Sequence, residues 1–148
     1  MDILLKPSAV FAFLKSSPYL LLTLIFLWLA NRYFPGLIWL SVFSAAFALY
    51  RYLYIRRCSY LVTGQYIRTT QGIFIKRIDT VELFRVKDYR VIEPFLLQLF
   101  RLMDLELKTT DPENPVVWLR GIPQSDIVET LRDRVLETRK YNQIVELN

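Results

Sequence analysis

Side chains with catalytic potential are scarce in this chain of 148 residues. It contains no histidine, so it lacks the imidazole that a Ser-His-Asp triad, a Cys-His pair or a His-ligated zinc site requires. Its single cysteine can form neither an internal disulfide nor a redox pair. The four glycines are too scattered to build a glycine-rich phosphate-binding loop: Gly36, Gly64, Gly72 and Gly121. The sequence therefore predicts a non-enzymatic protein without a cofactor or metal ion.

The remaining candidates for reactive chemistry are a few carboxylates and the one thiol. The carboxylates show no spacing typical of an acid-base pair, and we interpret them as solvated loop or strand positions: Asp104, Glu106, Asp111, Glu113 and Asp126. Cys58 follows Arg57, which leaves lipidation or redox sensing open, but an ordinary strand residue is the simpler interpretation.

Positive charge is concentrated in the N-terminal third of the chain. The formal net charge is +5, and residues 1–57 hold six Lys and Arg against one acidic residue. Residues 58–148 hold thirteen of each sign and are neutral overall. A neutral domain lacks the electrostatic footprint of a nucleic-acid-binding protein, so we expect no nucleic-acid partner.

One basic stretch nevertheless stands out in the neutral part. Its members are candidates for contact with anionic lipid headgroups or with a protein partner: Arg68, Lys76, Arg77, Arg85, Lys87 and Arg90. Four acidic residues alternate with them and offset most of the field, so the alternative is a solvated strand face: Asp79, Glu82, Asp88 and Glu93.

Two uncharged, apolar runs precede this domain, at residues 16–31 and 33–50. At about 1.5 Å per helical residue they cover roughly 24 and 27 Å, close to the ~30 Å hydrocarbon core of a bilayer. The short joint at 31–36 predicts an antiparallel transmembrane hairpin. We expect Ser17 to cap the first helix with Pro18 in its first turn, and Pro35 to open the second. Buried core helices or a cleaved signal peptide are the less favoured alternatives.

The residues flanking these runs predict how the hairpin is oriented. Aromatic and basic side chains favour the membrane interface, and the candidates are Lys15, Trp28, Arg32, Tyr33, Trp39, Arg51, Arg56 and Arg57. Most of the cations lie on the side of the two ends, so both termini are expected in the cytoplasm. Residues 3–14 are predicted to form a short interfacial helix or the cytoplasmic start of the first span.

Beyond Arg57 the apolar period changes to the twofold alternation of β-strands. Seven strands are predicted, with a short helix at 95–100 and a C-terminal helix from Asp126 to about Tyr141, capped by Ser125. The strands are expected at 58–62, 66–71, 73–78, 81–84, 89–92, 103–109 and 116–119. Such short strands with tight turns predict a curled antiparallel sheet, as a sandwich or a small barrel.

Several segments, taken in order, resemble a known family of membrane-anchored bacterial pleckstrin-homology-like (PH-like) domains. Residues 60–68 (YLVTGQYIR) resemble its opening hairpin, and 72–77 (GIFIKR) its second turn. Further similarity lies in 81–89 (VELFRVKDY), 95–107 (FLLQLFRLMDLEL) and 119–123 (LRGIP), and residues 6–8 (KPS) resemble a lead-in before the hairpin.

This resemblance implies a PH-like, partly open barrel of seven strands capped by a C-terminal α-helix. The domains would be a membrane hairpin at 1–57 and a cytoplasmic PH-like domain at 58–148. It implies no reaction. Relatives commonly carry glycine where this sequence has Arg101 and Met103, so we expect the turn at 100–104 to be built differently.

Four aromatic residues of the domain are most simply core residues: Phe84, Phe95, Phe100 and Trp118. The alternative is that some of them line a groove between the barrel and the last helix that accepts a partner peptide.

The leading functional hypothesis is a non-enzymatic adaptor or scaffold of the bacterial inner membrane. Its PH-like domain would bind a protein partner at the membrane surface, where confinement raises the partner's effective concentration. One alternative is a module that senses lipids or amphiphiles. Another is an accessory subunit of a larger membrane complex, with residues of the second span packing on other helices: Phe43, Ser44, Ala45, Ala46, Phe47 and Ala48.

Overall fold

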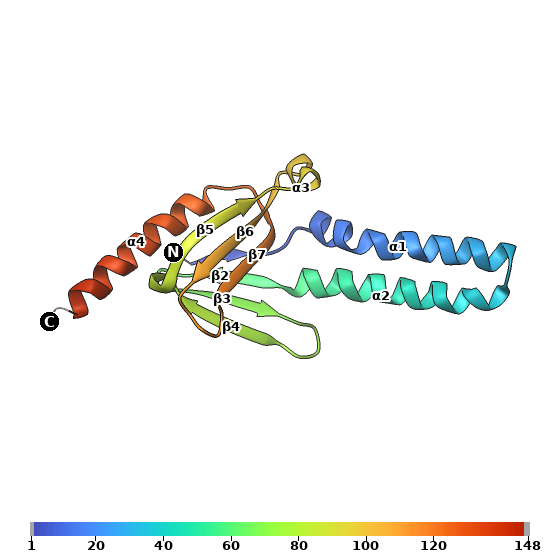
Figure 1. The fold of residues 1–148 in the computed structure, drawn as a ribbon, viewed down its shortest axis with the longest axis horizontal. Helices are drawn as coiled ribbons and strands as arrows, with labels where there is room; N and C mark the ends of the chain where they lie inside the picture. The colour runs from blue at the N-terminus through green and yellow to red at the C-terminus, as the bar shows by residue number, and fades with distance from the viewer. Residues whose placement is uncertain (1, 147–148) are drawn as a thin grey trace.

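A helical hairpin projects from one end of a small β domain in this computed structural model (Figure 1). The structure describes residues 2–146, the last five by their backbone only. The hairpin consists of α1 (Ala9–Arg32), the 3-10 turn η1 (Pro35–Leu37) and α2 (Ile38–Arg57). Both helices are long and apolar enough to cross a membrane. Only 17% of the most apolar window of each helix is buried, so neither is a core helix of this chain.

The two helices approach each other through small and hydroxyl side chains. Ser41 Oγ donates a hydrogen bond to the Thr23 carbonyl over 3.2 Å, and Ser44 Oγ donates to the Tyr19 carbonyl over 2.9 Å. Ala48 is fully buried at the same face. Small residues allow close helix packing, so Ser44 and Ala48 pack within the hairpin itself. The accessory-subunit hypothesis had instead assigned these two residues to contacts with other membrane-spanning helices.

The first helix begins nine residues earlier than predicted, because Ser8 and not Ser17 is its N-cap. The Ser8 hydroxyl accepts a hydrogen bond from the backbone N–H of Val10. Pro18 lies inside α1, where it removes the N–H that would reach the Leu14 carbonyl. Ser17 Oγ donates to that carbonyl instead, over 2.8 Å, which lets the helix continue through the proline. Pro35 opens the second helical segment, as predicted.

The expectation that residues 3–14 form one helix is wrong at its beginning. Ile3–Leu5 form strand β1, which pairs antiparallel with β2 (Ser59–Val62) in the register Ile3 to Val62 and Leu5 to Tyr60. The chain thus contributes a strand before the hairpin and returns to the same sheet after it.

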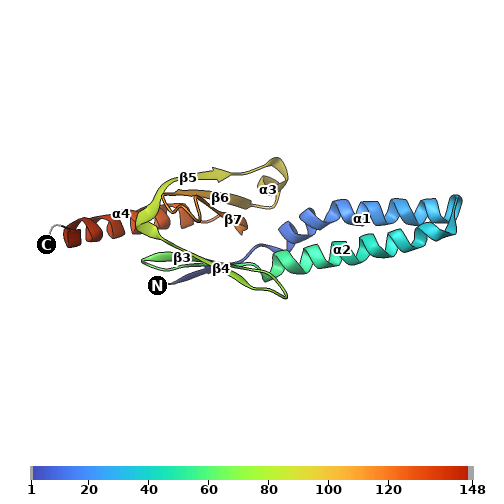
Figure 2. The same ribbon diagram turned by 60° about the horizontal axis from the view of Figure 1, so that its bottom comes forward.

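Within residues 2–146, seven strands form two antiparallel sheets, in the orders β1-β2-β3-β4 and β5-β6-β7. The further elements are β3 (Tyr66–Gln71), β4 (Arg77–Glu82), the 3-10 turn η2 (Leu83–Arg85), β5 (Val86–Ile92), α3 (Phe95–Leu99), β6 (Leu102–Thr109), β7 (Val116–Pro123) and α4 (Ile127–Glu146). Figure 2 shows the two sheets facing each other, with the connection from β4 to β5 passing between them at one end.

The prediction of two strands, at 73–78 and 81–84, is wrong, because the structure has a single strand there, β4. Residues 73–76 form a tight loop, β4 starts at Arg77, and Leu83 begins a 3-10 turn that leads the chain to the second sheet. Gly72 has a φ of 108°, and a Cβ atom added there would lie 2.0 Å from the Ile75 carbonyl oxygen. The loop therefore depends on glycine at this position.

The main core lies between the sheets and is closed at one end by α4. Leu83, Leu105, Leu107, Leu119 and Ile122 are among its buried side chains, and α4 adds Ile127 and Leu131. Arg134 of α4 donates hydrogen bonds to the carbonyls of Val62 and Thr63, over 3.0 and 3.1 Å. The predicted C-terminal helix and its closing role are thereby confirmed.

Arg101, which follows the C-cap Phe100 of α3, has a φ of 52°. Its N–H donates to the Gln98 carbonyl and its carbonyl accepts from the Gln124 N–H. This turn therefore uses a left-handed residue without glycine, at a conformational cost of about 1–2 kcal/mol. Met103 lies buried in β6 with no such strain.

Candidate functional site

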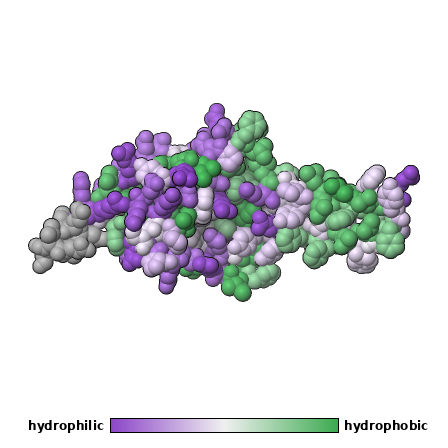
Figure 3. Space-filling model, in the orientation of Figure 1, coloured by the Kyte–Doolittle hydropathy of each residue, from purple (hydrophilic) through white to green (hydrophobic). Residues whose placement is uncertain are grey.

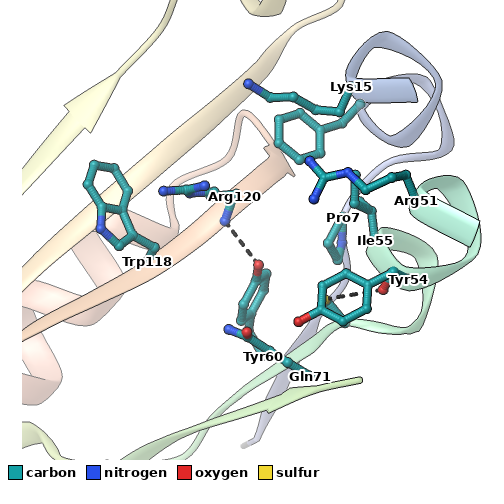
Figure 4. Close-up of a pocket in the computed structure, with 11 residues that line it drawn as sticks. Pro7, Lys15, Arg51, Tyr54, Ile55, Tyr60, Gln71, Trp118 and Arg120 are labelled. Atoms are coloured by element: carbon teal, nitrogen blue, oxygen red, sulfur yellow. Dashed lines mark hydrogen bonds between the residues drawn. The ribbon is translucent and has the colours of Figure 1, made fainter. Parts of the chain in front are cut away.

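A cavity of about 390 Å³ lies where the base of the hairpin meets the β domain (Figure 4). Its walls come from α1, α2 and the strands β2, β3 and β7. The lining residues are Pro7, Phe11, Lys15, Arg51, Tyr54, Ile55, Cys58, Tyr60, Gln71, Trp118 and Arg120.

Of the described residues that line this cavity, three are cationic and none is acidic; the cations are Lys15, Arg51 and Arg120. Within the described residues, none of the three forms an ion pair with a carboxylate. Arg51 Nε is shielded from solvent and has no hydrogen-bond partner among those residues. Because a buried donor without a partner costs free energy, this guanidinium favours an acceptor from outside the chain.

Aromatic rings hold two of these cations in place. Lys15 Nζ lies 5.6 Å from the centre of the Phe11 ring, and Arg120 Cζ lies 4.9 Å from the Trp118 ring. Figure 4 shows Lys15 and Arg51 on the helix side of the cavity, with Arg120 beside Trp118 across from them. Cation-π contacts orient the charges without neutralising them.

The packing of α1 on β7 determines how far Lys15 and Arg51 lie from Arg120 across the cavity. Gly121 has a φ of 63°, and a Cβ atom added to it would lie 2.2 Å from Phe11 Cγ. The Gly121 N–H donates to Asp104 Oδ1 over 2.6 Å, while its carbonyl accepts from the Ser8 N–H over 2.8 Å. Phe11 also packs in a second apolar cluster with Leu97 and Ile55. Hairpin and β domain are thus joined by direct packing.

The two weak acids in the wall are held in their neutral forms. Burial raises the pKa of the Tyr60 phenol to about 12, against the lowering effect of the Arg120 N–H that donates to its oxygen over 3.2 Å. Burial also raises the pKa of the Cys58 thiol, partly offset by a backbone hydrogen bond from Gly72. Neither group adds negative charge at neutral pH, and the thiol is a poor nucleophile.

The arrangement can bind an anion but offers little for catalysis. Arginine and lysine recognise phosphate or carboxylate oxygens through charge-assisted hydrogen bonds. Among the described residues, no group of three or more Cys, Asp and Glu side chains is placed to hold a metal ion.

The eight residues predicted at a membrane interface fall at the two ends of the hairpin. Trp28, Arg32, Tyr33 and Trp39 gather at the turn, where the rings of Trp28 and Tyr33 meet edge to face at 6.4 Å. At the base, Lys15 and Arg51 enter the cavity, Arg56 donates to the Pro7 carbonyl over 3.3 Å, and Arg57 ends α2. Their contact with a membrane stays a prediction.

The six cations of the basic stretch are spread over both sheets and do not line the cavity. Arg68 lies on β3 beside the Tyr66 ring, whereas Lys87 and Arg90 lie on β5. Three of the six pair with acidic residues: Arg77 with Asp79 at 2.9 Å, Arg85 with Glu82 at 3.3 Å, and Arg90 with Glu106 at 3.9 Å. Lys76 precedes β4 in the loop. Their lipid or partner contact stays a prediction.

The interpretation of the four aromatic residues as core is wrong. Phe95 is 76% exposed, Phe100 is also exposed, and Trp118 is half-buried in the cavity wall. Phe84 lines a groove of about 480 Å³ between the β2–β3 turn and α4, as the alternative had suggested for some of them. Aromatic character alone does not tell a core position from a surface one.

Sequence reasoning missed Arg120 as a site residue. A signal was present, because Trp118 and Arg120 alternate with the buried Val117 and Leu119 and must therefore face outward. What the alternation could not reveal is that the base of the hairpin covers this face.

Comparison with known proteins places the fold in a family. A family model described as Bacterial PH domain matches residues 8–138, which include the hairpin and almost all of the β domain. No curated protein and no solved structure matches the chain.

Proposed function

The chain belongs to the bacterial PH domain family, and on that premise we propose that it is a non-enzymatic membrane protein that binds the phosphate headgroup of an anionic amphiphile. In this proposal the hairpin spans the bacterial inner membrane twice and both termini are cytoplasmic. The cavity at the base of the hairpin is the binding site.

The observation that carries the proposal is the trio of Lys15, Arg51 and Arg120, which have no acidic partner among the described residues, together with the Nε of Arg51, which has no hydrogen-bond partner there. A phosphate oxygen would satisfy that donor. A volume of about 390 Å³ lies within the range of small-molecule sites, roughly 300–1,000 Å³.

The position of the cavity favours an amphiphile as the ligand. Lys15 directly precedes the uncharged run of α1, and Arg51 directly follows the uncharged run of α2, so both lie at the base of the hairpin. Basic side chains at such a point lie at headgroup level when a helix crosses a bilayer. A headgroup could therefore enter while its acyl chains stay in the hydrocarbon layer.

Binding of short-chain lipids to the full chain in detergent tests the proposal. The probes are dihexanoyl phosphatidic acid, inorganic phosphate and the zwitterionic dihexanoyl phosphatidylcholine, measured by calorimetry. We expect phosphatidic acid to bind and Arg51→Gln to weaken it about tenfold, equivalent to about 1.4 kcal/mol. Binding of phosphate alone with equal affinity would assign the site to a soluble phosphate compound.

Arg132→Gln is the matched control, because Arg132 is exposed on α4, outside the cavity. An equal loss of binding in Arg132→Gln and Arg51→Gln would show that the anionic lipid is attracted by the overall positive charge and not by the cavity, and would refute the site.

A second candidate function, the adaptor for a protein partner, is favoured by the groove beside α4. It lies toward the end of the β domain away from the hairpin (Figure 1). Tyr66 and Phe84 provide apolar walls, and Glu137 provides negative charge, whereas the charge of Glu82 is offset by its ion pair with Arg85. The groove suits a basic, apolar peptide segment.

Photo-crosslinking in intact cells tests this second function. With p-benzoylphenylalanine in place of Phe84, one partner should be captured, and Glu137→Lys should abolish that capture. Capture that persists in the Glu137→Lys variant would speak against the groove as the contact.

A further inference from the structure

Two exposed apolar tips flank the base of the hairpin. The loop tip comprises residues 73–76, in which Phe74 is 88% and Ile75 87% exposed. The helix tip is the outer face of α3, where Phe95 is 76% and Leu99 66% exposed. In both Figure 1 and Figure 2 the tips lie on opposite sides of the hairpin, level with its base, where α1 begins and α2 ends.

In Figure 3 apolar protrusions stand out at the upper and lower edges of the β domain, at the end nearest the hairpin, and border its polar surface. Large apolar side chains that remain in water forgo the free energy of burial. Two such tips at the same end of the domain indicate an apolar environment that the chain itself does not provide.

Both tips are held in place by the structure behind them. Gly72, with its φ of 108°, allows the tight loop that turns Phe74 and Ile75 outward. On the other side, Leu97 of α3 is buried against Phe11 and Ile55 of the hairpin, so the helix tip is fixed to the base of the two helices.

Their depth matches the headgroup layer of a bilayer that the hairpin crosses. Phe11, which packs with Leu97, precedes Lys15 by about 6 Å along α1. The headgroup layer on each side of the hydrocarbon core is roughly 5–8 Å thick. Apolar side chains at this level reach the boundary of the acyl chains.

Basic residues follow each tip, which is the composition of an interfacial anchor. Lys76 ends the loop tip, and Arg101 follows the helix tip. Apolar rings enter the interface while neighbouring cations contact anionic headgroups.

We propose that the loop tip and the helix tip insert into the leaflet from which the hairpin enters the membrane, so that the β domain is pressed against the lipid surface. This inference rests on the proposed membrane span of the hairpin. Its occupant is lipid, because the tips continue the exposed apolar surface of the hairpin at interfacial depth.

Quenching by nitroxide-labelled lipids tests the insertion in the full chain. In a Cys58→Ala background, Phe74→Cys, Leu99→Cys, Phe43→Cys and Arg132→Cys each carry an NBD fluorophore. The proteins are placed one copy per nanodisc in phosphatidylcholine, which has no net charge, so insertion does not depend on an anionic ligand.

We expect strong quenching at position 43, which is exposed on the hairpin. Positions 74 and 99 should be quenched at least about twofold more than position 132 on α4, because only the tips reach the interface. Quenching at 43 but at neither tip would overturn this inference alone, whereas absence of quenching at 43 would refute the membrane span.

A second copy of the chain is the competing occupant of the tips. An NBD blue shift at 74 and 99 that appears only in nanodiscs holding two copies would assign the tips to a dimer and overturn the proposal. A blue shift that is equal in both preparations supports lipid as the occupant.

Discussion

The ring of Phe11 lies directly over the backbone of Gly121, so that a Cβ atom at Gly121 would come within 2.2 Å of Phe11 Cγ. This contact seats the first helix on β7 and thereby brings Lys15 of the hairpin near Arg120 of the sheet. The cavity between them exists because a glycine lets the two elements approach.

Replacement of Gly121 should weaken the packing of the first helix on β7. Gly121→Ala introduces a clash and a strained φ of 63°, and we expect it to lower the free energy of unfolding by about 1–3 kcal/mol. Denaturant unfolding in detergent measures the loss. Gly64→Ala is the matched control, because its Cβ would meet nothing within 4 Å; an equal loss there would contradict the close-approach argument.

The left-handed turn at Arg101 predicts a stabilising substitution. Arg101→Gly relieves the cost of φ 52°, and the free energy of unfolding should rise by up to about 1 kcal/mol after the entropy loss of glycine is included. Thermal unfolding reports the change. Arg101→Ala removes the same guanidinium but keeps a Cβ, so stabilisation by Ala as large as by Gly would rule out backbone strain as the cause.

The buried phenol of Tyr60 predicts a loss of stability at alkaline pH. Its pKa is raised from 10.0 to about 12 by burial, so the unfolded chain releases this proton first. The contribution of the neutral Tyr60 phenol to the free energy of unfolding is complete below pH 10. It is lost progressively toward pH 12, by roughly 1.4 kcal/mol per pH unit. Unfolding of wild type and Tyr60→Phe across this interval isolates it.

Tyr60→Phe also removes the acceptor of the Arg120 N–H, which should cost about 1–2 kcal/mol at neutral pH. A pH dependence between 10 and 12 that is the same in both proteins would show that Tyr60 is not its source.

The proposed orientation predicts which side of the membrane each end of the hairpin faces. In a Cys58→Ala background, Arg32→Cys at the turn should react with an impermeant maleimide added outside cells whose outer membrane is permeabilised. Gly64→Cys, on an exposed turn of the β domain, should react only after the inner membrane is opened. The reverse pattern would invert the topology.

The hairpin could be predicted because two uncharged runs of sufficient length depend only on local composition. The first residue of its first helix could not be predicted, because α1 extends upstream of the apolar run as far as its N-cap Ser8. Those extra turns are stabilised by contact of Phe11 with β7 and α3, which lie far away in the sequence.

The strands were predicted where alternation coincides with burial, as in Leu105 and Leu107 of β6. Residues 73–78 alternate in the same way, yet Phe74 and Ile75 protrude from a loop. Periodicity records which residues share a face but not what covers that face. The three residues of β1 are too few to show any period.

The sequence by itself determined which reactive residue types the chain lacks, the two apolar runs and most of the strands, because composition and short periods are local properties. Only the tertiary structure decided that Lys15, Arg51 and Arg120 surround one cavity and that two apolar tips flank the hairpin. The three cations come together because the helix pair packs on a sheet through the contact of Phe11 with Gly121. Contacts between distant segments arise from packing, which no local pattern encodes.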